Sequence, residues 1–207
     1  MIDPVRYIGN YSTGKMGFAI AEHLASIGAK VILVCGPVNL ALENPAISRI
    51  DVTSADQMYN ACMQYFKDCD GAIMTAAVAD FAPVMKETEK IKRKEGNLMI
   101  ELRTNRDIAA ELGRIKKSNQ ILVGFALESQ NEIENALSKL KRKNLDMVVL
   151  NSLNETGAGF GYDTNKITIL TRDGEIFGYE LKPKKEVAVD IINRMLEISS
   201  RYVSPIE

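Results

Sequence analysis

The chain has 207 residues, of which 46% are hydrophobic and 26% charged, values typical of a soluble globular protein of one or two domains. With 26 Lys and Arg against 27 Asp and Glu, the formal net charge is -1, which argues against nucleic-acid binding driven by overall positive charge. Three cysteines without C-x-x-C spacing argue against a disulfide framework or a structural zinc site. No apolar run approaches the length of a membrane span, so we expect a cytoplasmic protein with no membrane partner.

Short apolar runs alternate with amphipathic stretches along most of the chain. In chain order, their periodicity predicts a helix over Lys15–Ile27, a strand over Lys30–Cys35, a helix over Ser54–Phe66 and a strand over Gly71–Ala77. Further along, it predicts a helix over Asp107–Lys116, a strand over Gln120–Leu127, a helix over Glu132–Lys143 and a strand over Asp146–Leu150. Strands that are apolar throughout and separated by helices are typical of a parallel sheet covered on both faces.

The last part of the chain has a different pattern. Ile167–Leu170 and Glu175–Tyr179 are predicted to form a hairpin with its turn at Arg172-Asp173-Gly174, followed by a helix over Lys184–Ser199. We therefore predict an α/β fold: a Rossmann-like open parallel sheet with helices on both faces, followed by a C-terminal β-hairpin and helix. No repeat or linker divides the chain, so residues 1–207 are interpreted as a single domain.

The segment Phe81–Arg103 interrupts the alternation, because it combines a dense charge run with the alternating strand pattern Leu98–Arg103. An excursion of this length is either a mobile functional loop or an arm that reaches elsewhere. An edge strand with Leu98, Ile100 and Leu102 on one face needs a cover. We therefore predict a protruding arm that pairs with a second copy of the chain, with a strand packed on its own domain as the alternative.

Several polar residues are candidates for a site at the carboxyl ends of the strands, where open α/β sheets bind ligands. The stretch Arg6–Gly17 places hydroxyls, glycines and cations before the first helix, which suits an anion or an ordinary capped helix start. Asp80 follows a predicted strand and could hold a ribose hydroxyl or a metal ion, or could simply face solvent.

The remaining candidates are lysines on charged segments, and one histidine. Lys90 lies in the charge run, which is more often solvated surface than a site. Lys139 and Lys143 share a helix face, where they could serve an anion or only the helix dipole. His23 stands alone, and the cysteines are interpreted as core residues. From spacing alone, the chain is an anion-binding α/β protein.

Five ordered sequence blocks carry a resemblance to a known family. They are DPVRYIGNYSTGKMGFAIAEHL (Asp3–Leu24), AAVADF (Ala76–Phe81), EKIKR (Glu89–Arg93), VGFALE (Val123–Glu128) and KLKRKNLDMVVLN (Lys139–Asn151). Together they resemble phosphopantothenoylcysteine synthetase, in particular the synthetase half of the bacterial bifunctional synthetase/decarboxylase of coenzyme A biosynthesis. The resemblance extends from Asp3 to the C-terminal helix.

The resemblance implies a ligase that uses CTP. A carboxylate of 4′-phosphopantothenate attacks the α-phosphate of CTP, which gives an acyl-cytidylate and pyrophosphate, and the amine of L-cysteine then displaces CMP. The family is dimeric, with a flap in the region of the predicted arm. The resemblance further implies Mg²⁺ as the ion that accompanies the triphosphate.

The resemblance also implies roles for individual residues. Asn10 matches the residue associated with the acyl-cytidylate, and Arg6 lies on the same loop. Residues that match positions at the nucleotide, its phosphates or its Mg²⁺ are Ala76, Ala77, Asp80 (also the implied metal ligand), Lys90, Phe125, Lys139 and Lys143.

The chain departs from the family at its beginning. A strand and a glycine-containing loop precede the Asp-Pro pair in the family, whereas here that pair is residues 3–4. That strand should be central to the sheet. The departure favours an excised part of a longer bifunctional chain, and because the decarboxylase half is absent from the sequence we expect no flavin.

Three alternatives remain open. The same ligase chemistry could use ATP, because nucleotide choice rests on a few hydrogen bonds to the base. A Rossmann-like oxidoreductase would need a glycine fingerprint, which the sequence lacks. A non-catalytic nucleotide-binding module would not require both Asn10 and Lys90.

Overall fold

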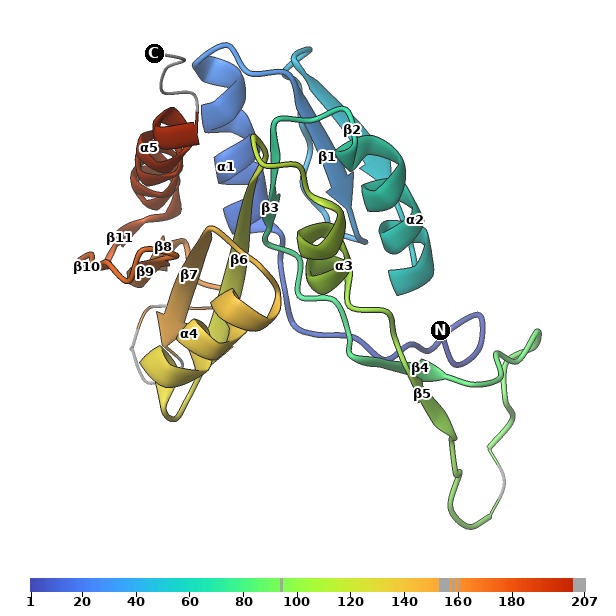
Figure 1. The fold of residues 1–207 in the computed structure, drawn as a ribbon. Coiled ribbons are helices and arrows are strands. Elements are labelled where there is room, and N and C mark those ends of the chain that lie inside the picture. The colour runs from blue at the N-terminus through green and yellow to red at the C-terminus, as the bar shows by residue number, and fades with distance from the viewer. Residues whose placement is uncertain (94, 153–156, 158, 160, 203–207) are drawn as a thin grey trace.

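The computed structural model describes residues 1–93, 95–152, 157, 159 and 161–202. Its central element is a five-stranded sheet of order β10-β9-β7-β6-β3 (Figure 1). Neighbouring strands among β3, β6 and β7 are parallel, and β9 and β10 extend the sheet as an antiparallel hairpin. The strands are β3 (Gly71–Met74), β6 (Ile121–Glu128), β7 (Met147–Ser152), β9 (Ile167–Thr171) and β10 (Ile176–Gly178).

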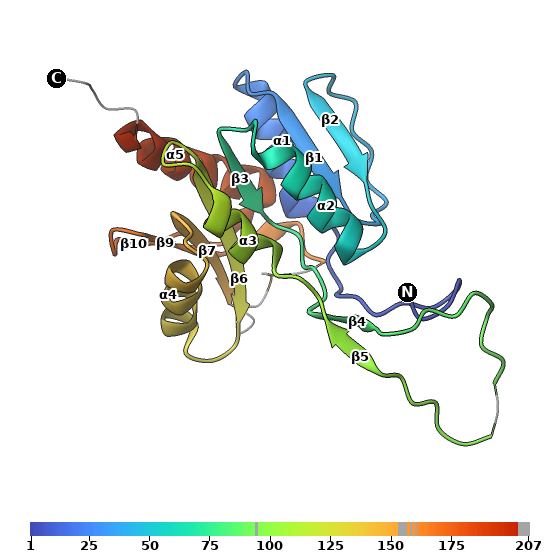
Figure 2. The same ribbon diagram turned by 45° about the vertical axis from the view of Figure 1, so that its right-hand side comes forward.

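A second parallel pair forms a sheet of its own. It consists of β1 (Val31–Cys35) and β2 (Ile47–Asp51). Strand β2 was not predicted from the sequence, because Arg49 and Asp51 interrupt the apolar pattern of ISRID. Figures 1 and 2 place β3 beside β1, yet in the part of the chain that the structure describes no ladder of backbone hydrogen bonds joins them. The predicted single open sheet is thus divided between β1 and β3.

Five helices cover the five-stranded sheet and the β1–β2 pair: α1 (Lys15–Ser26), α2 (Ala55–Phe66), α3 (Ile108–Ile115), α4 (Glu132–Arg142) and α5 (Lys184–Tyr202). Ser54 and Asp107 cap α2 and α3, since their side chains accept hydrogen bonds from the main-chain N–H groups of Gln57 and Ala110. None of the described helices has the length and apolar composition that crossing a bilayer requires.

The helices build two hydrophobic cores, one on each face of the sheet. Alternate residues of β6 and β7 point to opposite faces, so Val123 and Val149 pack with α1 and α5, whereas Leu122 and Val148 pack with α2, α3 and α4. The predicted α/β architecture with helices on both faces is therefore confirmed. The C-terminal hairpin and helix are also present, and two short strands, β8 (Thr164–Asn165) and β11 (Lys182–Pro183), pair beside them.

The charged segment is an arm that protrudes from the rest of the chain (Figure 2). Its base is the antiparallel pair β4 (Phe81–Pro83) and β5 (Leu102–Thr104). The prediction of a strand over Leu98–Arg103 is wrong for residues 98–101, which form no strand in the structure. Their apolar side chains are largely uncovered: Leu98 is 55% and Met99 93% exposed, whereas Ile100 is half-buried.

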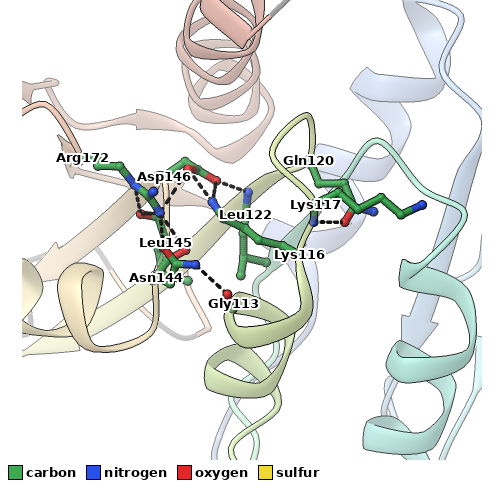
Figure 3. Close-up of polar contacts among 9 residues, drawn as sticks. All are labelled: Gly113, Lys116, Lys117, Gln120, Leu122, Asn144, Leu145, Asp146 and Arg172. Carbon is green, nitrogen blue, oxygen red and sulfur yellow. Dashed lines mark hydrogen bonds and ion pairs between the residues drawn. The ribbon is translucent and has the colours of Figure 1, made fainter.

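A buried carboxylate joins four elements at the amino edge of the sheet (Figure 3). Asp146, which precedes β7 and is 1% exposed, accepts a hydrogen bond of 2.7 Å from the Leu122 N–H of β6 and of 2.6 Å from Lys116, just after α3. Arg172, at the end of β9, lies 3.3 Å from the same carboxylate. Burial lowers the pKa of Lys116 in spite of this pairing, because the charged amine loses its hydration. The ion pair therefore fixes geometry more than it adds stability.

Removing one partner of this pair leaves a buried charge uncompensated. We expect Asp146→Asn to lower the free energy of unfolding by about 3–5 kcal/mol in a denaturant titration. The control is Glu197→Gln, which removes a half-exposed ion pair with Arg194 and should cost no more than about 1 kcal/mol. Equal effects of the two substitutions would contradict the role given to Asp146.

Candidate nucleotide-binding site

The predicted site residues lie on several elements: Phe125 in β6, Lys139 in α4, Lys143 just after α4, and Asn10, Ala76, Ala77 and Asp80 on the loops before α1 and after β3. Asn10 lies on the loop before α1, and its side-chain amide donates a hydrogen bond of 3.0 Å to the Ala77 carbonyl, on the loop after β3. This bond brings together two residues from separate predicted motifs. Asn10 and Ala76 are exposed, so both face solvent and are open to a ligand.

Lys139 of α4 lies beside β6. The Lys139 ammonium donates a hydrogen bond of 2.8 Å to the Phe125 carbonyl. Burial, together with the neighbouring charge of Lys143, lowers the pKa of Lys139, while the carboxylates of Glu128, Asp107 and Asp80 act in the opposite direction. The structure thus places the Lys139 ammonium directly against the main chain of β6 at Phe125.

Lys143 is held by a partner that the sequence analysis treated only as the start of a helix. Its ammonium lies 2.8 Å from Asp107, the residue that caps α3. Burial tends to raise the pKa of Asp107, but the hydrogen bonds from Lys143 and Ala110 outweigh it and lower that pKa. Gly113 permits this approach of α3 to the end of α4, because a Cβ there would lie 1.9 Å from the Lys143 carbonyl oxygen.

Asp80 has an exposed carboxylate on a fixed main chain. Asn105 donates hydrogen bonds of 2.8 Å from its N–H to the Asp80 carbonyl and from its side chain to the Ala79 carbonyl. Within the described residues, no cluster of three or more His, Cys, Asp or Glu could hold a metal ion. A lone carboxylate suits Mg²⁺, which commonly uses one or two carboxylates together with substrate phosphates. Asp80 fits that arrangement.

Arg6 and Lys90 are placed differently from the other predicted site residues. Arg6 forms an ion pair with the buried Asp3 and donates a hydrogen bond of 2.9 Å to the Ile91 carbonyl on the arm. The Lys90 side chain is exposed on the arm and makes no hydrogen bond or ion pair to another described residue. The structure thus connects Lys90 to the Asn10 loop only through the main chain of its neighbour, Ile91.

The start of α1 adds polar groups that the sequence analysis grouped as an anion site without assigning them individually. α1 begins after Gly14, whose φ of 78° favours glycine, and no side chain caps its first N–H groups. A pocket of about 510 Å³ lies between this helix start and the loop after β1, and Lys15 at its edge pairs with Asp163 at 2.7 Å. Its lining residues are Ser12, Thr13, Lys15, Pro37, Val38, Asn39 and Leu40.

The cysteines are poorly suited to nucleophilic chemistry. All three are free, and burial raises the pKa of Cys62 to about 11, so its thiolate is scarce at neutral pH. Burial likewise raises the pKa of Cys35 and Cys69. Their interpretation as packing residues agrees with this. The fold and site together define an α/β protein of the open-sheet type. The amide of Asn10 and the carboxylate of Asp80 lie on loops at the carboxyl edge, where such sheets bind ligands, and Lys139 and Lys143 are each held by a partner on a neighbouring element.

The chain belongs to the family described as the DNA/pantothenate metabolism flavoprotein C-terminal domain, whose model matches residues 1–198. It is 43% identical over 200 residues to the coenzyme A biosynthesis bifunctional protein CoaBC of Bacillus subtilis (strain 168), a match that covers 97% of this chain and 49% of that protein. A crystal structure of the C-terminal domain of CoaBC superposes with a TM-score of 0.79 at 40% identity, covering 95% of this chain and 89% of that one.

Another relative has a different name. The chain is 56% identical over 197 residues to a cysteine/cysteine sulfinic acid decarboxylase of an unknown prokaryotic organism, covering 95% of this chain and 55% of that protein. This chain thus spans about half the length of the curated relatives it matches. The Cab2 mutant H337A in complex with phosphopantothenate-cysteine shares the fold with a TM-score of 0.74 at 17% identity, covering 96% of this chain and 82% of that one.

Proposed function

We propose that the chain is the ligase part of a coenzyme A biosynthesis enzyme, which joins 4′-phosphopantothenate to L-cysteine at the expense of CTP. The observation that carries the proposal is the hydrogen bond of Asn10 to Ala77, because it unites the acyl-site residue and the nucleotide-site loop that the family resemblance implies. The relatives named CoaBC support the same assignment.

The proposed reaction has two steps. A carboxylate oxygen of phosphopantothenate forms a bond to the α-phosphorus of CTP, and pyrophosphate leaves. The amine of cysteine then attacks the acyl carbonyl, loses a proton and displaces CMP. Lys139, Lys143 and the arm residue Lys90 offset the negative charge that develops on the phosphates. Asp80, with phosphate oxygens, would hold Mg²⁺, which neutralises part of the triphosphate charge.

Asn10 suits the second step in this scheme. An uncharged amide next to the acyl carbonyl can donate a hydrogen bond to it without repelling the neighbouring phosphate. Ala76 and Ala77 are small enough to let the nucleotide approach the main chain, and Phe125 offers an aromatic ring near the base.

The direct test is to incubate the protein with phosphopantothenate, Mg²⁺ and either CTP or ATP, with and without cysteine. We expect pyrophosphate release with CTP and amide product only when cysteine is present. Faster release with ATP would replace CTP in the proposal. A parallel measurement of CO₂ release from cysteine sulfinate addresses the decarboxylase name of one relative, and decarboxylation without ligation would overturn the ligase assignment.

Asn10→Asp should separate the two half-reactions. The substitution removes the amide donor and places negative charge beside the acyl phosphate, so pyrophosphate release should persist while amide product falls by roughly 10²-fold or more. Asn119→Asp, an equal change at an exposed position in the turn before β6, is the control and should leave both steps unchanged. Amide yield from Asn10→Asp equal to wild type would remove Asn10 from the mechanism.

Lys90→Gln should impair the first step instead. Loss of one cation that stabilises developing phosphate charge commonly costs about 10²–10³ in rate. Pyrophosphate release and amide formation should therefore fall together. Lys86→Gln removes the same charge from the same arm and should have little effect; equal effects of the two variants would mean that Lys90 acts only through the net charge of the arm.

We further propose that the chain is a homodimer joined through the arm. Several apolar side chains on the arm and on the N-terminal segment are exposed: Tyr11 and Met99 are each 93% exposed and Met85 is 78% exposed. Covering such side chains with a partner removes apolar area from water, which favours association. A second copy would bury them symmetrically on both chains.

Met99→Glu should shift the assembly to a monomer in analytical ultracentrifugation, because it places a charge in the proposed interface. Ile27→Glu, at an exposed position after α1, is the control and should leave the association unchanged. A wild-type chain that sediments as a monomer at micromolar concentration would contradict the proposed dimer.

A further inference from the structure

One buried carboxylate lies in an otherwise exposed part of the N-terminal segment. Asp3 has 0% exposure, although residues 4–11 on the same segment are all exposed. The hydrogen bonds of Arg6, assisted by N–H groups of the main chain, hold the pKa of Asp3 well below its usual range. Asp3 is therefore ionised throughout the neutral range, and its carboxylate is occupied by hydrogen bonds from other groups of the protein.

The Asp3 carboxylate first closes a short turn of its own segment. It accepts hydrogen bonds of 2.8 Å from the N–H groups of Val5 and Arg6 and of 2.9 Å from the Arg6 Nε. The main chain supports the turn, since the Ile2 N–H donates to the Arg6 carbonyl at 2.7 Å. The guanidinium and the carboxylate are thereby presented side by side as one rigid unit.

That unit holds the main chain of a single arm residue. The Ile91 N–H donates to Asp3 at 3.2 Å, and the Ile91 carbonyl accepts from Arg6 at 2.9 Å. Both polar main-chain groups of Ile91 are thus bound, while the residues on either side of it are Lys90 and Lys92. A second contact lies close by, since the Glu87 N–H donates to the Ile2 carbonyl at 3.0 Å.

The same segment is bound to the nucleotide-site loop at its other end. Asn10 follows Arg6 by four residues and donates its amide hydrogen bond to Ala77. The stretch from Asp3 to Asn10 therefore bridges the arm and the loop after β3. Within the described chain, no other hydrogen bond joins residues 84–93 and 95–101 to the core; they continue from the β4–β5 base, beside which the Val84 N–H donates to the Glu101 carbonyl.

We infer that Asp3, with Arg6, is a positioning residue that clamps Ile91 and so holds Lys90 at a fixed place relative to Asn10. The inference rests on the proposed function for its chemical meaning. It also changes the role expected for Arg6. Because the Nε and one terminal nitrogen of Arg6 are bound to Asp3 and Ile91, Arg6 acts by holding the arm and not by contacting the reacting atoms.

The physical reason is the loss of freedom that the clamp imposes before substrate binds. A lysine on an unclamped arm must be ordered in each catalytic cycle, and the conformational entropy lost in that ordering raises the activation free energy. A clamp on the adjacent main chain removes this cost while leaving the Lys90 side chain free to meet a phosphate. The rate of the first step should depend on the clamp, and the stability of the core should not.

The first test measures the clamp directly by amide hydrogen exchange. Asp3→Asn keeps the side-chain size but removes the charge and one acceptor oxygen, so exchange of the Ile91 amide should accelerate about tenfold or more. The amide of Leu122, in the core, should exchange as in wild type. An unchanged Ile91 amide would overturn the inference.

The second test asks whether Asp3 acts through Lys90. We expect Asp3→Asn to lower kcat for pyrophosphate release by about 10-fold or more with a smaller change in the KM for CTP. In combination with Lys90→Gln, Asp3→Asn should cause little further loss, because the lysine it positions is already gone. Fully multiplicative effects of the two substitutions would show that Asp3 does not work through Lys90, and so would overturn the inference.

A variant on the arm keeps the test open if Asp3→Asn fails to fold. Ile91→Pro deletes the N–H that donates a hydrogen bond to Asp3 and leaves Asp3 and Arg6 intact. It should therefore reproduce the loss in kcat. Asn97→Pro is the matched control, since its N–H makes no hydrogen bond to a described residue. Equal kcat for Ile91→Pro and Asn97→Pro would contradict the clamp.

Failure of the proposed function and failure of the clamp give different results. If the wild-type chain forms no acyl-nucleotide, the proposed function fails, and the exchange of the Glu87 and Ile91 amides still decides whether the clamp exists.

Discussion

The buried carboxylate of Asp146 is the interaction on which the arrangement of the sheet depends. It binds the N–H of Leu122 on the neighbouring strand and the Lys116 ammonium beyond α3, while Arg172 approaches from the end of β9. A one-residue slip between β6 and β7 would leave a charge buried without these partners, so the register is strongly specified. Because that register is set at the amino edge, the positions of Phe125 and of the loops at the carboxyl edge follow from it.

The carboxyl edge carries out its proposed work with residues from elements that are distant in the sequence. Lys143, just after α4, is paired with the cap of α3, and Lys139 is bound to a carbonyl of β6. These fixed cations suit a triphosphate, since groups that are already ordered stabilise developing charge without reorganisation. Lys90 is the exception, because it stands on an arm outside the core. The Asp3–Arg6 pair supplies from the N-terminal segment the order that core packing supplies to the other lysines.

The parallel strands of this chain are divided between two sheets. The chain covers about half of the CoaBC protein of Bacillus subtilis and nearly all of a solved CoaBC C-terminal domain. In the part of the chain that the structure describes, the β1–β2 pair and the five-stranded sheet are separate sheets. The two cores nevertheless cover both faces of the five-stranded sheet.

The sequence by itself determined the helices, most strands and the family, because hydrophobic periodicity and contiguous motifs are local properties. It placed the starts of α2 and α3 close to where the structure has them, but it missed β2, whose Arg49 and Asp51 obscure the pattern, and it extended the arm strand over residues 98–101. Only the tertiary structure decided that Asp107 holds Lys143 and that Arg6 is engaged by Asp3. Asp3 and Ile91 are 88 residues apart, and no local pattern encodes a contact whose partners meet only when the arm folds back along the N-terminal segment.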